Sequence, residues 1–532
     1  MRIHSQWKKL FMTVPFSLAI FLLAAVPTSQ LRATGNSPLF LPAVTYDSGE
    51  NGAESLTVAD VDLDGKLDVV VANSSSVGVL LGNGDGTFQS TVTYGSKGSF
   101  GASVAVADVD GDGKPDVVVA NSCASSQCNG ALLGSVSVLL GNGDGTFQTA
   151  VAYDSGGVNA TSVAIADVNG DRKLDLVVTN VCAIDNCPGN GIVGVLLGNG
   201  DGTFQPVVTY LSGGSAAASV KVADVNGDGK PDLVVANSFN GVGVLLGNGD
   251  GTFQTAVSYE SGGNPASSLA VADVNGDGKM DLVLANNCAS GSNCPPSDGT
   301  VGVLLGNGDG TFKVPTSYDS GGVFASSVAI ADVNGDGKSD VLVANFASNT
   351  VGVLLGNGDG TFEHAVTYGS GGDGALSVAV ADLIKNGKPD LLVASDVGPF
   401  ANGHGAVGVL LHTVRDTTPP VITLSATPKV LWPPNGKMVP VTVSGTITDT
   451  GSGVNVNSAA YAVKDEYGKV QPHGAITLGP GGAYSFTILL QASRLGTDLD
   501  GRRYTVTVRA RDNAGNGGSK TSVVTVPHDH RD

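Results

Sequence analysis

Short apolar runs recur along most of the chain, each of them bounded by Gly, Asn and Asp. In the fifth repeat they are Ser268–Ala272, Asp281–Ala285, Val301–Leu305 and Thr311–Tyr318. Runs of this length between such turn residues are typical of antiparallel β-strands, and no long amphipathic helical pattern appears. The pattern therefore predicts an all-β chain built from four-stranded sheets.

A nine-residue motif separates the first two runs of every repeat. In the second repeat it extends from Asp108 to Asp116, and its first Asp falls at positions 60, 108, 167, 224, 273, 332 and 382. Oxygen-bearing side chains at positions 1, 3, 5 and 9 of the loop, without Cys or His, suit Ca²⁺. Gly at position 6 permits a positive φ. Position 7 is always Lys, whose ammonium we expect to point into water.

Six of these loops carry a complete ligand set, which predicts about six Ca²⁺ sites. The candidate metal ligands are Asp60, Asp62, Asp64 and Asp68; Asp108, Asp110, Asp112 and Asp116; Asp167, Asn169, Asp171 and Asp175; Asp224, Asn226, Asp228 and Asp232; Asp273, Asn275, Asp277 and Asp281; and Asp332, Asn334, Asp336 and Asp340. The alternative is that they are Asp/Gly hairpin turns without metal, but four carboxyl-type groups in one loop would then repel one another.

Two loops depart from the pattern. The third has Arg172 at position 6, which costs backbone freedom but removes no ligand. The seventh keeps Asp382 and Asp390, but Ile384 cannot bind a metal and Asn386 replaces a carboxylate. We expect the seventh loop to be empty or weak.

The two ends of the repeat array complement each other. A Phe and a Tyr six residues apart recur in every repeat, and the first such pair, Phe40 and Tyr46, has no repeat before it. The last repeat stops at His412, before its final turn and outer strand. A closed ring removes both exposed edges if the N-terminal strand completes the last sheet. Residues 36–413 are therefore predicted to form a seven-bladed β-propeller of four-stranded blades.

The segment 327–345, Ser-Val-Ala-Ile-Ala-Asp-Val-Asn-Gly-Asp-Gly-Lys-Ser-Asp-Val-Leu-Val-Ala-Asn, resembles FG-GAP/VCBS repeats. This is the repeat class of the integrin α-subunit propeller and of many exported bacterial proteins. The resemblance covers residues 38–413. It implies a seven-bladed propeller with Ca²⁺ in the hairpin between the first two strands of a blade.

The remaining segments predict an exported two-domain protein. Basic residues followed by an apolar run from Leu10 to Val26 identify residues 1–33 as a secretory signal peptide, the alternative being a retained anchor. No second apolar run of membrane-spanning length follows. Residues 414–420 form a Pro-containing linker. The alternating runs in 421–527 (Val421–Ala426, Val439–Ile447, Ala459–Val463, Tyr484–Leu490, Tyr504–Ala510 and Ser522–Val526) suggest an immunoglobulin-like sandwich similar to bacterial Ig-like modules.

The net charge bears on the class of binding partner, and the cysteine pattern bears on disulfide formation. The formal net charge is −20, and no basic patch exists to neutralise phosphates, which argues against nucleic acid. The six cysteines fall as three local pairs, Cys123/Cys128, Cys182/Cys187 and Cys288/Cys294. In an exported chain they predict three disulfides that shape loops, and zinc is the alternative.

No catalytic constellation is evident. The histidines share no spacing, and no Gly-x-Ser-x-Gly motif is present. We therefore expect a secreted or cell-surface, non-catalytic recognition or adhesion scaffold for an extracellular protein or glycan. The alternatives are a polysaccharide lyase or hydrolase with its site at the ring's central opening, and a purely structural surface protein.

Five phenylalanines are expected on the face opposite the Asp loops. Each is expected either to be buried or to join a recognition patch. They are Phe100, Phe239, Phe324, Phe346 and Phe400.

Overall fold

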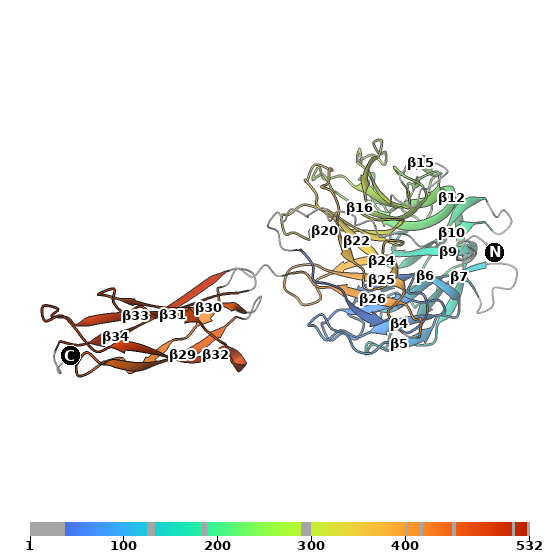
Figure 1. The fold of residues 1–532 in the computed structure, drawn as a ribbon. Coiled ribbons are helices and arrows are strands. Elements are labelled where there is room, and N and C mark those ends of the chain that lie inside the picture. The colour runs from blue at the N-terminus through green and yellow to red at the C-terminus, as the bar shows by residue number, and fades with distance from the viewer. Residues whose placement is uncertain are drawn as a thin grey trace, which may run out of the picture. The chain divides into compact units, whose positions relative to one another are not determined.

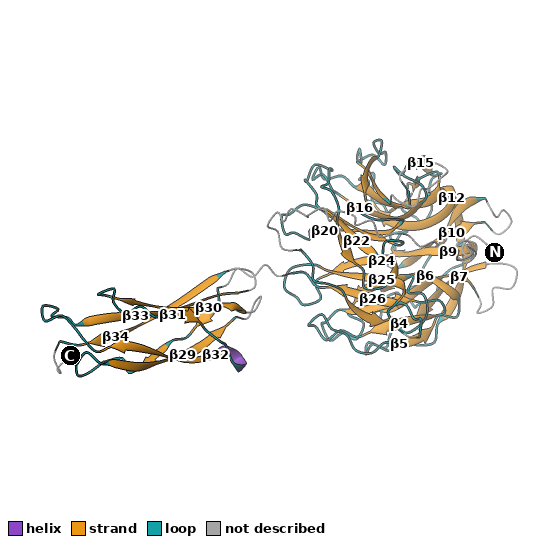
Figure 2. Ribbon diagram, in the orientation of Figure 1, coloured by secondary structure: helices purple, strands orange, loops and turns teal. Residues whose placement is uncertain are grey.

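The computed structural model describes residues 38–124, 133–183, 189–288, 299–400, 402–413, 419–449, 454–512 and 516–528. These residues form two compact units that divide between His412 and Thr413. The all-β prediction is confirmed: the described part of the chain contains 34 strands and a single short 3₁₀ helix, η1 (Pro480–Gly482), drawn purple in Figure 2.

The first unit contains seven four-stranded antiparallel sheets, numbered here in chain order. The first is β2 (Ser55–Ala59), β3 (Asp68–Ala72), β4 (Ser76–Leu80) and β5 (Val92–Gly95); the second is β6 (Ser99–Ala107), β7 (Asp116–Cys123), β8 (Leu133–Leu139) and the start of β9 (Val151–Ala166); the third is the end of β9, β10 (Asp175–Cys182), β11 (Asn190–Leu196) and the start of β12 (Val208–Ala223); the fourth is the end of β12, β13 (Asp232–Phe239), β14 (Val242–Leu245) and β15 (Val257–Tyr259); the fifth is β16 (Ala266–Ala272), β17 (Asp281–Asn286), β18 (Thr300–Leu304) and β19 (Thr316–Asp319); the sixth is β20 (Ala325–Ala331), β21 (Asp340–Asn345), β22 (Thr350–Leu354) and β23 (Val366–Gly369); and the seventh is β24 (Asp373–Ala381), β25 (Asp390–Val397), β26 (Ala406–Leu410) and β1 (Val44–Asp47).

Two long strands join the second, third and fourth sheets. Strand β9 pairs with β8 through residues 151–154 and again at Val158, and it pairs with β10 through residues 158–166, so it changes sheet midway. Strand β12 does the same between β11 and β13. The three sheets consequently share backbone hydrogen bonding as one ten-stranded array.

The N-terminal strand completes the last sheet, as the ends of the sequence predict. Strand β1 pairs antiparallel with β26, with Val44 opposite Val409, and Phe40 forms a β-bridge with His412. In Figure 1 the blue strand β4 of the first sheet lies beside the orange strands β25 and β26 of the seventh. The first and last parts of the repeat array therefore meet.

The hydrophobic core of the first unit is divided into seven clusters, each lying between two neighbouring sheets. One of them joins Leu56 and Val71 of the first sheet to Leu392 and Val407 of the seventh. The second strands are buried on both sides, which explains their continuous apolar runs such as residues 69–72 of β3. Sheet contacts thus return from the seventh sheet to the first, as the predicted ring requires.

The recurring Phe and Tyr pack between sheets. Each Tyr on an outer strand lies edge-to-face against the Phe of the following sheet, with ring centroids 5.3 to 5.5 Å apart: Tyr46–Phe88, Tyr94–Phe147, Tyr153–Phe204, Tyr210–Phe253, Tyr259–Phe312, Tyr318–Phe362 and Tyr368–Phe40. Edge-to-face pairs add about 0.5–1.5 kcal/mol each beyond burial. The N-terminal segment therefore contributes two pairs, one to the sheet on either side.

A belt of serines connects the first strands of the sheets. In six cases a serine Oγ accepts the backbone N–H of a residue in the next sheet at 3.2 to 3.5 Å: Ser55 from Val104, Ser103 from Val163, Ser162 from Val220, Ser268 from Val328, Ser327 from Val378 and Ser377 from Leu56. The last of these bonds joins the seventh sheet to the first. Ser219 occupies the seventh equivalent position, opposite Ala236.

The second unit contains two four-stranded sheets. One consists of β27 (Val421–Ile422), β28 (Ser425–Thr427), β29 (Met438–Thr448) and β32 (Ala483–Gln491), and the other of β30 (Val454–Asp465), β31 (His473–Ala475), β33 (Arg502–Asp512) and β34 (Gly517–Val526). A single hydrophobic cluster draws buried residues from both sheets. All six predicted runs contain a strand, and β31 was not predicted. The immunoglobulin-like assignment stays a prediction.

A fully buried ion pair lies in this unit. The guanidinium of Arg502 donates to both carboxylate oxygens of Asp465 at 2.9 and 2.6 Å, and it packs against the rings of Tyr467 and Tyr504 at 4.8 and 4.7 Å. Burial acts to raise the pKa of Asp465, but the hydrogen bonds from Arg502 and from backbone N–H groups outweigh it and lower that pKa to about 2.

Several predictions fall on residues outside the described ranges. They include the signal peptide of residues 1–33, most of the linker 414–420, and one cysteine of each pair, Cys128, Cys187 and Cys294. Their partners Cys123, Cys182 and Cys288 are buried, and no described cysteine is free. The three local disulfides stay a prediction. Within the described ranges no helix has the length and apolarity to cross a membrane.

Candidate metal centres

The Asp loops connect the first and second strands of each sheet, and in the first six sheets the Gly-Asn-Gly-Asp-Gly turns connect the third and fourth strands on the same face. The carboxylate of the position-9 Asp accepts hydrogen bonds from both the loop and the segment that follows the third strand. The carboxylate of Asp116 accepts N–H groups from Val109 in its own loop and from Gly141 in the turn, both at 2.8 Å. All seven position-9 residues are completely buried and make an equivalent pair of bonds, with His412 in place of the turn glycine for the last of them: Asp68, Asp116, Asp175, Asp232, Asp281, Asp340 and Asp390.

The position-1 Asp organises the loop backbone. In the second loop Asp108 accepts N–H groups from Gly111, Asp112 and Gly113 at 2.8 to 3.1 Å. Gly113, at position 6, has the expected positive φ of 86°. In the third loop Arg172 replaces this glycine and still adopts φ 67°, donating its N–H to Asp167. Arg172 therefore carries backbone strain that a glycine would not.

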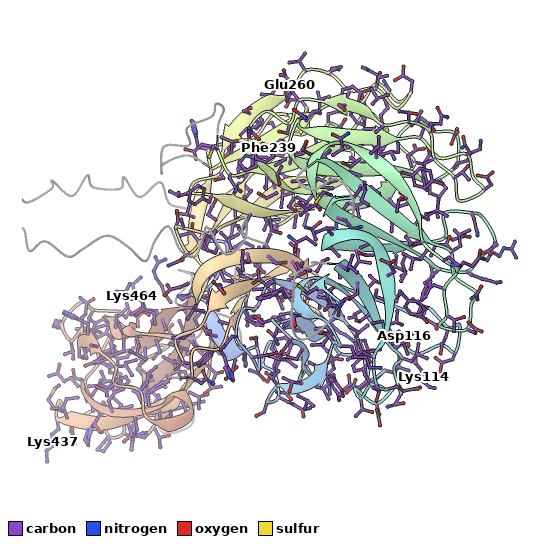
Figure 3. All side chains as sticks on the ribbon, turned by 90° about the vertical axis from the view of Figure 1, so that its right-hand side faces the viewer. Lys114, Asp116, Phe239, Glu260, Lys437 and Lys464 are labelled. Atoms are coloured by element: carbon purple, nitrogen blue, oxygen red, sulfur yellow. The ribbon has the colours of Figure 1, made fainter. Side chains whose placement is uncertain are left out.

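The first two loops gather three carboxylates each. Oxygens of Asp60, Asp62 and Asp68, and of Asp108, Asp110 and Asp116, lie within 4.8 Å of one another and could hold a metal ion. Figure 3 labels Asp116 and Lys114 in the second loop. Burial, with repulsion from neighbouring carboxylates, raises the pKa of Asp68 and of Asp116 to about 6. A bound divalent cation would relieve this repulsion.

In the third to sixth loops Asn replaces the position-3 carboxylate. Its amide oxygen takes over the same local role: Asn226 Oδ1 accepts the N–H of Asp228 at 2.9 Å, as Asp110 accepts that of Asp112 at 3.1 Å. Burial again raises the pKa of the position-9 residues Asp175, Asp232, Asp281 and Asp340. These loops share the backbone frame of the first two and carry one less negative charge.

The seventh loop keeps the frame without the full set of oxygens. Asp382 accepts N–H groups from Asn386 and Gly387 at 2.9 and 2.7 Å, and Asp390 accepts that of His412 at 2.7 Å. Ile384, at position 3, offers no ligand oxygen. The carboxylates at positions 1 and 9 therefore stabilise the loop in a way that needs no metal, which the sequence alone could not separate from metal binding.

The position-7 lysines lie at the surface, and five of them also pair with the position-5 carboxylate of their own loop. Lys66 and Lys114 form ion pairs of 2.6 Å with Asp64 and Asp112, the position-5 residues of their own loops. These side chains remain 34 to 42% exposed. The pairs form because the hairpin brings positions 5 and 7 to the same side, and such exposed pairs contribute little to stability.

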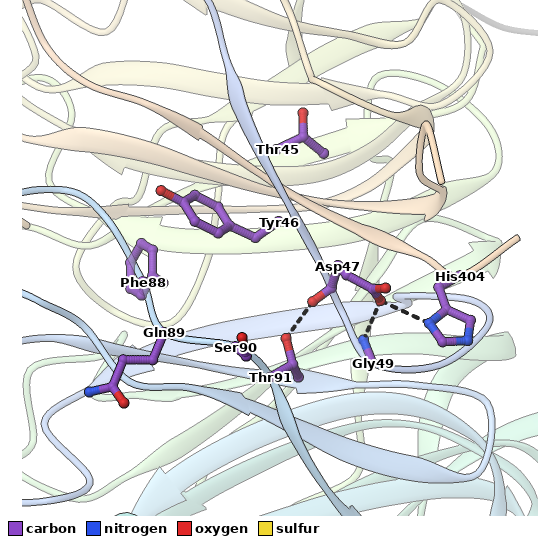
Figure 4. A pocket seen from close by; sticks show the side chains of 9 residues that line it. All are labelled: Thr45, Tyr46, Asp47, Gly49, Phe88, Gln89, Ser90, Thr91 and His404. Atoms are coloured by element: carbon purple, nitrogen blue, oxygen red, sulfur yellow. Dashed lines mark hydrogen bonds and ion pairs between the residues drawn. The ribbon is translucent and has the colours of Figure 1, made fainter. Parts of the chain in front are cut away.

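A pocket of about 430 Å³ lies where β1 meets the first sheet. Figure 4 shows its lining residues with Asp47 at the centre, where the carboxylate contacts Gly49 N at 2.8 Å and His404 Nδ1 at 2.9 Å. Burial acts to raise the pKa of Asp47, but hydrogen bonds from Gly49, Asn402 and His404 hold it below its ordinary value. These contacts fasten the N-terminal strand, and the sequence did not point to them.

Exposed phenylalanines lie at the strand ends opposite the Asp loops. Phe100 is 52%, Phe239 54% and Phe346 37% exposed, so burial is the wrong expectation for these three. Phe100 and Phe324 also have positive φ values of 56° and 59°. A bulky side chain at positive φ is uncommon and marks a strained position.

The repeat pattern matches a family model. FG-GAP-like repeats are found at residues 39–119, 125–178, 181–235, 224–284, 289–343 and 332–393, and an FG-GAP repeat at residues 100–139. The matched segments cover more than half of the 532 residues. The chain therefore belongs to the FG-GAP-like repeat family. No curated protein matches it significantly.

Solved structures resemble the chain at low identity. The crystal structure of BBS1N in complex with ARL6DN is 13% identical with a TM-score of 0.45, over 70% of this chain and 97% of that one. A putative oxidoreductase (glucose dehydrogenase) from Thermus thermophilus is 14% identical with a TM-score of 0.38, over 69% and 100%. A Lactobacillus plantarum protein is 13% identical with a TM-score of 0.41, over 60% and 84%.

Proposed function

We propose that the protein is a secreted or cell-surface, calcium-binding β-propeller that acts as a non-catalytic recognition scaffold for an extracellular protein or glycan. The observation that carries the calcium assignment is the group of three carboxylates within 4.8 Å in each of the first two loops. An all-oxygen donor set of this kind suits Ca²⁺ rather than a softer metal. The four loops with Asn at position 3 take the same ion with one less negative charge.

The recognition surface is the face opposite the Asp loops. Connections there vary in length, whereas the Asp loops are constant, and variation of this kind is typical of binding loops on a rigid scaffold. Phe100 and Phe239 place more than half of each side chain in solvent on this face. Aromatic side chains, Phe among them, are enriched at protein–protein interfaces relative to the rest of the surface.

Equilibrium dialysis of the full chain against ⁴⁵Ca²⁺ tests the metal assignment. Six ions per chain are expected, one for each complete loop, and two or fewer would overturn it. A glycan and matrix-protein array, run with Ca²⁺ and with EDTA, tests recognition. The double variant Phe100→Ala/Phe239→Ala should lose the signal, while Val44→Ala, which is equally exposed on the outer strand β1, should keep it.

The second candidate function is a polysaccharide-processing enzyme that uses the ring's central opening. The same array ligands, incubated with the protein and assayed for new reducing or unsaturated sugar ends, distinguish the two functions. A recognition scaffold binds without producing new ends. Turnover that survives the phenylalanine substitutions would favour the enzyme.

A further inference from the structure

Lys221 breaks the repeat pattern on the first strands of the sheets. It lies on the second half of β12 and pairs with Val234. The equivalent positions in the other six sheets, defined by the same strand register, hold Thr57, Ala105, Ala164, Ala270, Ala329 and Ala379. One sheet therefore carries a cation where five carry Ala and one carries Thr.

The first strands surround a common opening. At the level of Lys221 each first strand pairs along one edge only, with the second strand of its sheet, because β9 and β12 pair with the preceding sheet only as far as Val158 and Ser215. Each contacts the first strand of the sheet on either side, in the cycle β2, β6, β9, β12, β16, β20, β24 and back to β2. The unpaired edges of the seven strands therefore face inward, and the serine belt lies two residues before the level of Lys221.

The environment of Lys221 combines depth with access to solvent. Its side chain is exposed, yet burial alone, with no contribution from a neighbouring carboxylate, lowers its pKa. A side chain that projects from an innermost strand into the space that the seven first strands enclose satisfies both observations. An ammonium held there without a carboxylate partner is partly desolvated, and an anion would stabilise it.

Hydrogen-bond donors accompany this charge. Ser219 lies two residues before Lys221 on the same side of the strand and is 9% exposed. In six of the seven belt serines the Oγ already accepts a backbone N–H. A hydroxyl that accepts one bond retains its own proton to donate.

We propose that the central opening beside Lys221 binds a carboxylate, whose single negative charge the Lys221 ammonium balances while belt serine hydroxyls donate hydrogen bonds to its oxygens. A carboxylate fits better than a phosphate monoester, because one cation matches one charge and the monoester carries about −1.5 to −2 at pH 7. The ligand is a small free carboxylate or the acidic group of a sugar. This binding involves neither the proposed Ca²⁺ sites nor the exposed phenylalanines Phe100 and Phe239.

The test is isothermal titration of the full chain in saturating Ca²⁺ with acetate, galacturonate and, as the neutral match, galactose. We expect saturable binding of acetate or galacturonate and none of galactose. A preference for galacturonate over acetate identifies a sugar acid as the source, and equal affinity identifies the free carboxylate. Absence of saturable binding by the wild-type protein would overturn the proposal.

Lys221→Ala is the decisive variant, because five sheets carry Ala at this position and the change should preserve the fold. Affinity should fall roughly tenfold or more, as expected for loss of a charge-assisted hydrogen bond. Lys313→Ala, which removes an exposed lysine elsewhere, should change nothing. If Lys221→Ala binds as tightly as the wild type, the site lies elsewhere. Lys221→Thr, which introduces the residue that the first sheet carries at this position, provides a second variant. Measuring the number of Ca²⁺ ions bound per chain on the same samples keeps this result separate from the metal assignment.

Discussion

Alanine substitution of Asp116 and Asp390 separates the proposed metal-dependent role of the position-9 carboxylate from its metal-independent role. Both side chains are completely buried, and each accepts two backbone N–H groups. A buried donor that loses its acceptor costs about 1–3 kcal/mol, so either substitution should cost roughly 2–6 kcal/mol. Burial raises the pKa of both carboxyls, and removing the charge at neutral pH returns part of that cost.

The proposed calcium site would add a second contribution at Asp116 and none at Asp390. At ~2 mM free Ca²⁺ and a Kd of ~10⁻⁴ M, one site stabilises the folded state by roughly 1.8 kcal/mol. Six independent sites would together contribute about 10 kcal/mol. Asp116→Ala should therefore reduce the Ca²⁺-dependent part of the stability by about one sixth, whereas Asp390→Ala, in the loop that lacks a position-3 oxygen, should leave that part unchanged.

The assay is urea unfolding of the wild type and both variants at pH 7.5, each in 2 mM Ca²⁺ and in EDTA, followed by far-ultraviolet circular dichroism. For each protein the difference between the two conditions gives the Ca²⁺-dependent stability. An unchanged difference in Asp116→Ala would show that the second loop binds no Ca²⁺ that contributes to stability. A stability in EDTA that is equal to the wild type in Asp390→Ala would refute the structural role of the carboxylate.

Three further predictions rest on the described contacts. Without Ca²⁺, the stability of the folded state should fall as pH rises through about 6. Burial raises the pKa of Asp68 from its ordinary value of 3.8 to about 6, so between these values the folded state binds more protons than the unfolded state. Urea unfolding midpoints in EDTA at pH 5 and pH 8 check this, and equal midpoints would contradict it. Deletion of residues 38–47 should expose the edge of β26 and cause aggregation or loss of cooperative unfolding; a variant that melts like the intact protein would mean that the ring is not closed by this strand. Arg502→Met should cost about 3–5 kcal/mol, because it leaves the charge of Asp465 buried without its partner. In the wild type the second unit should lose stability as pH falls from 3.8 through about 2, the lowered pKa of Asp465. The fluorescence of Trp432, the only tryptophan after residue 33, reports unfolding in both experiments, and unchanged unfolding would count against the ion pair.

Sequence alone located the strands and loops because their signals are local. The apolar runs, the Gly-rich turns and the nine-residue Asp motif each lie within about a dozen residues, and the structure places a strand in every run of the fifth repeat. The last of these begins at Thr316 rather than at the predicted Thr311, because Phe312 forms only an isolated bridge with Gly306. The strand that completes the seventh sheet was also predictable, since an unmatched half-repeat stands at each end.

The candidate site was predictable in composition but not in the division of roles. The pattern identified the oxygen-bearing residues of each loop, but it could not show that the carboxylates at positions 1 and 9 also bind backbone N–H groups in a loop without a full ligand set. Nor could it show that Lys66 folds back on Asp64. These contacts depend on the hairpin geometry, which residue types alone do not specify.

Only the tertiary structure decided which residues of different repeats touch one another. The spacing of Phe40 and Tyr46 was visible in the sequence, yet the rings pack on partners in neighbouring sheets, Tyr368 and Phe88, rather than on each other. The serine belt and the position of Lys221 at its opening were likewise hidden, because Ser and Ala in a strand carry no local signal of what lies opposite. A local sequence pattern determines the repeat length of the chain and the face of the strand on which a residue lies. The neighbours of that residue depend on packing between sheets that are about fifty residues apart in the sequence, because those contacts form only once the strands have assembled.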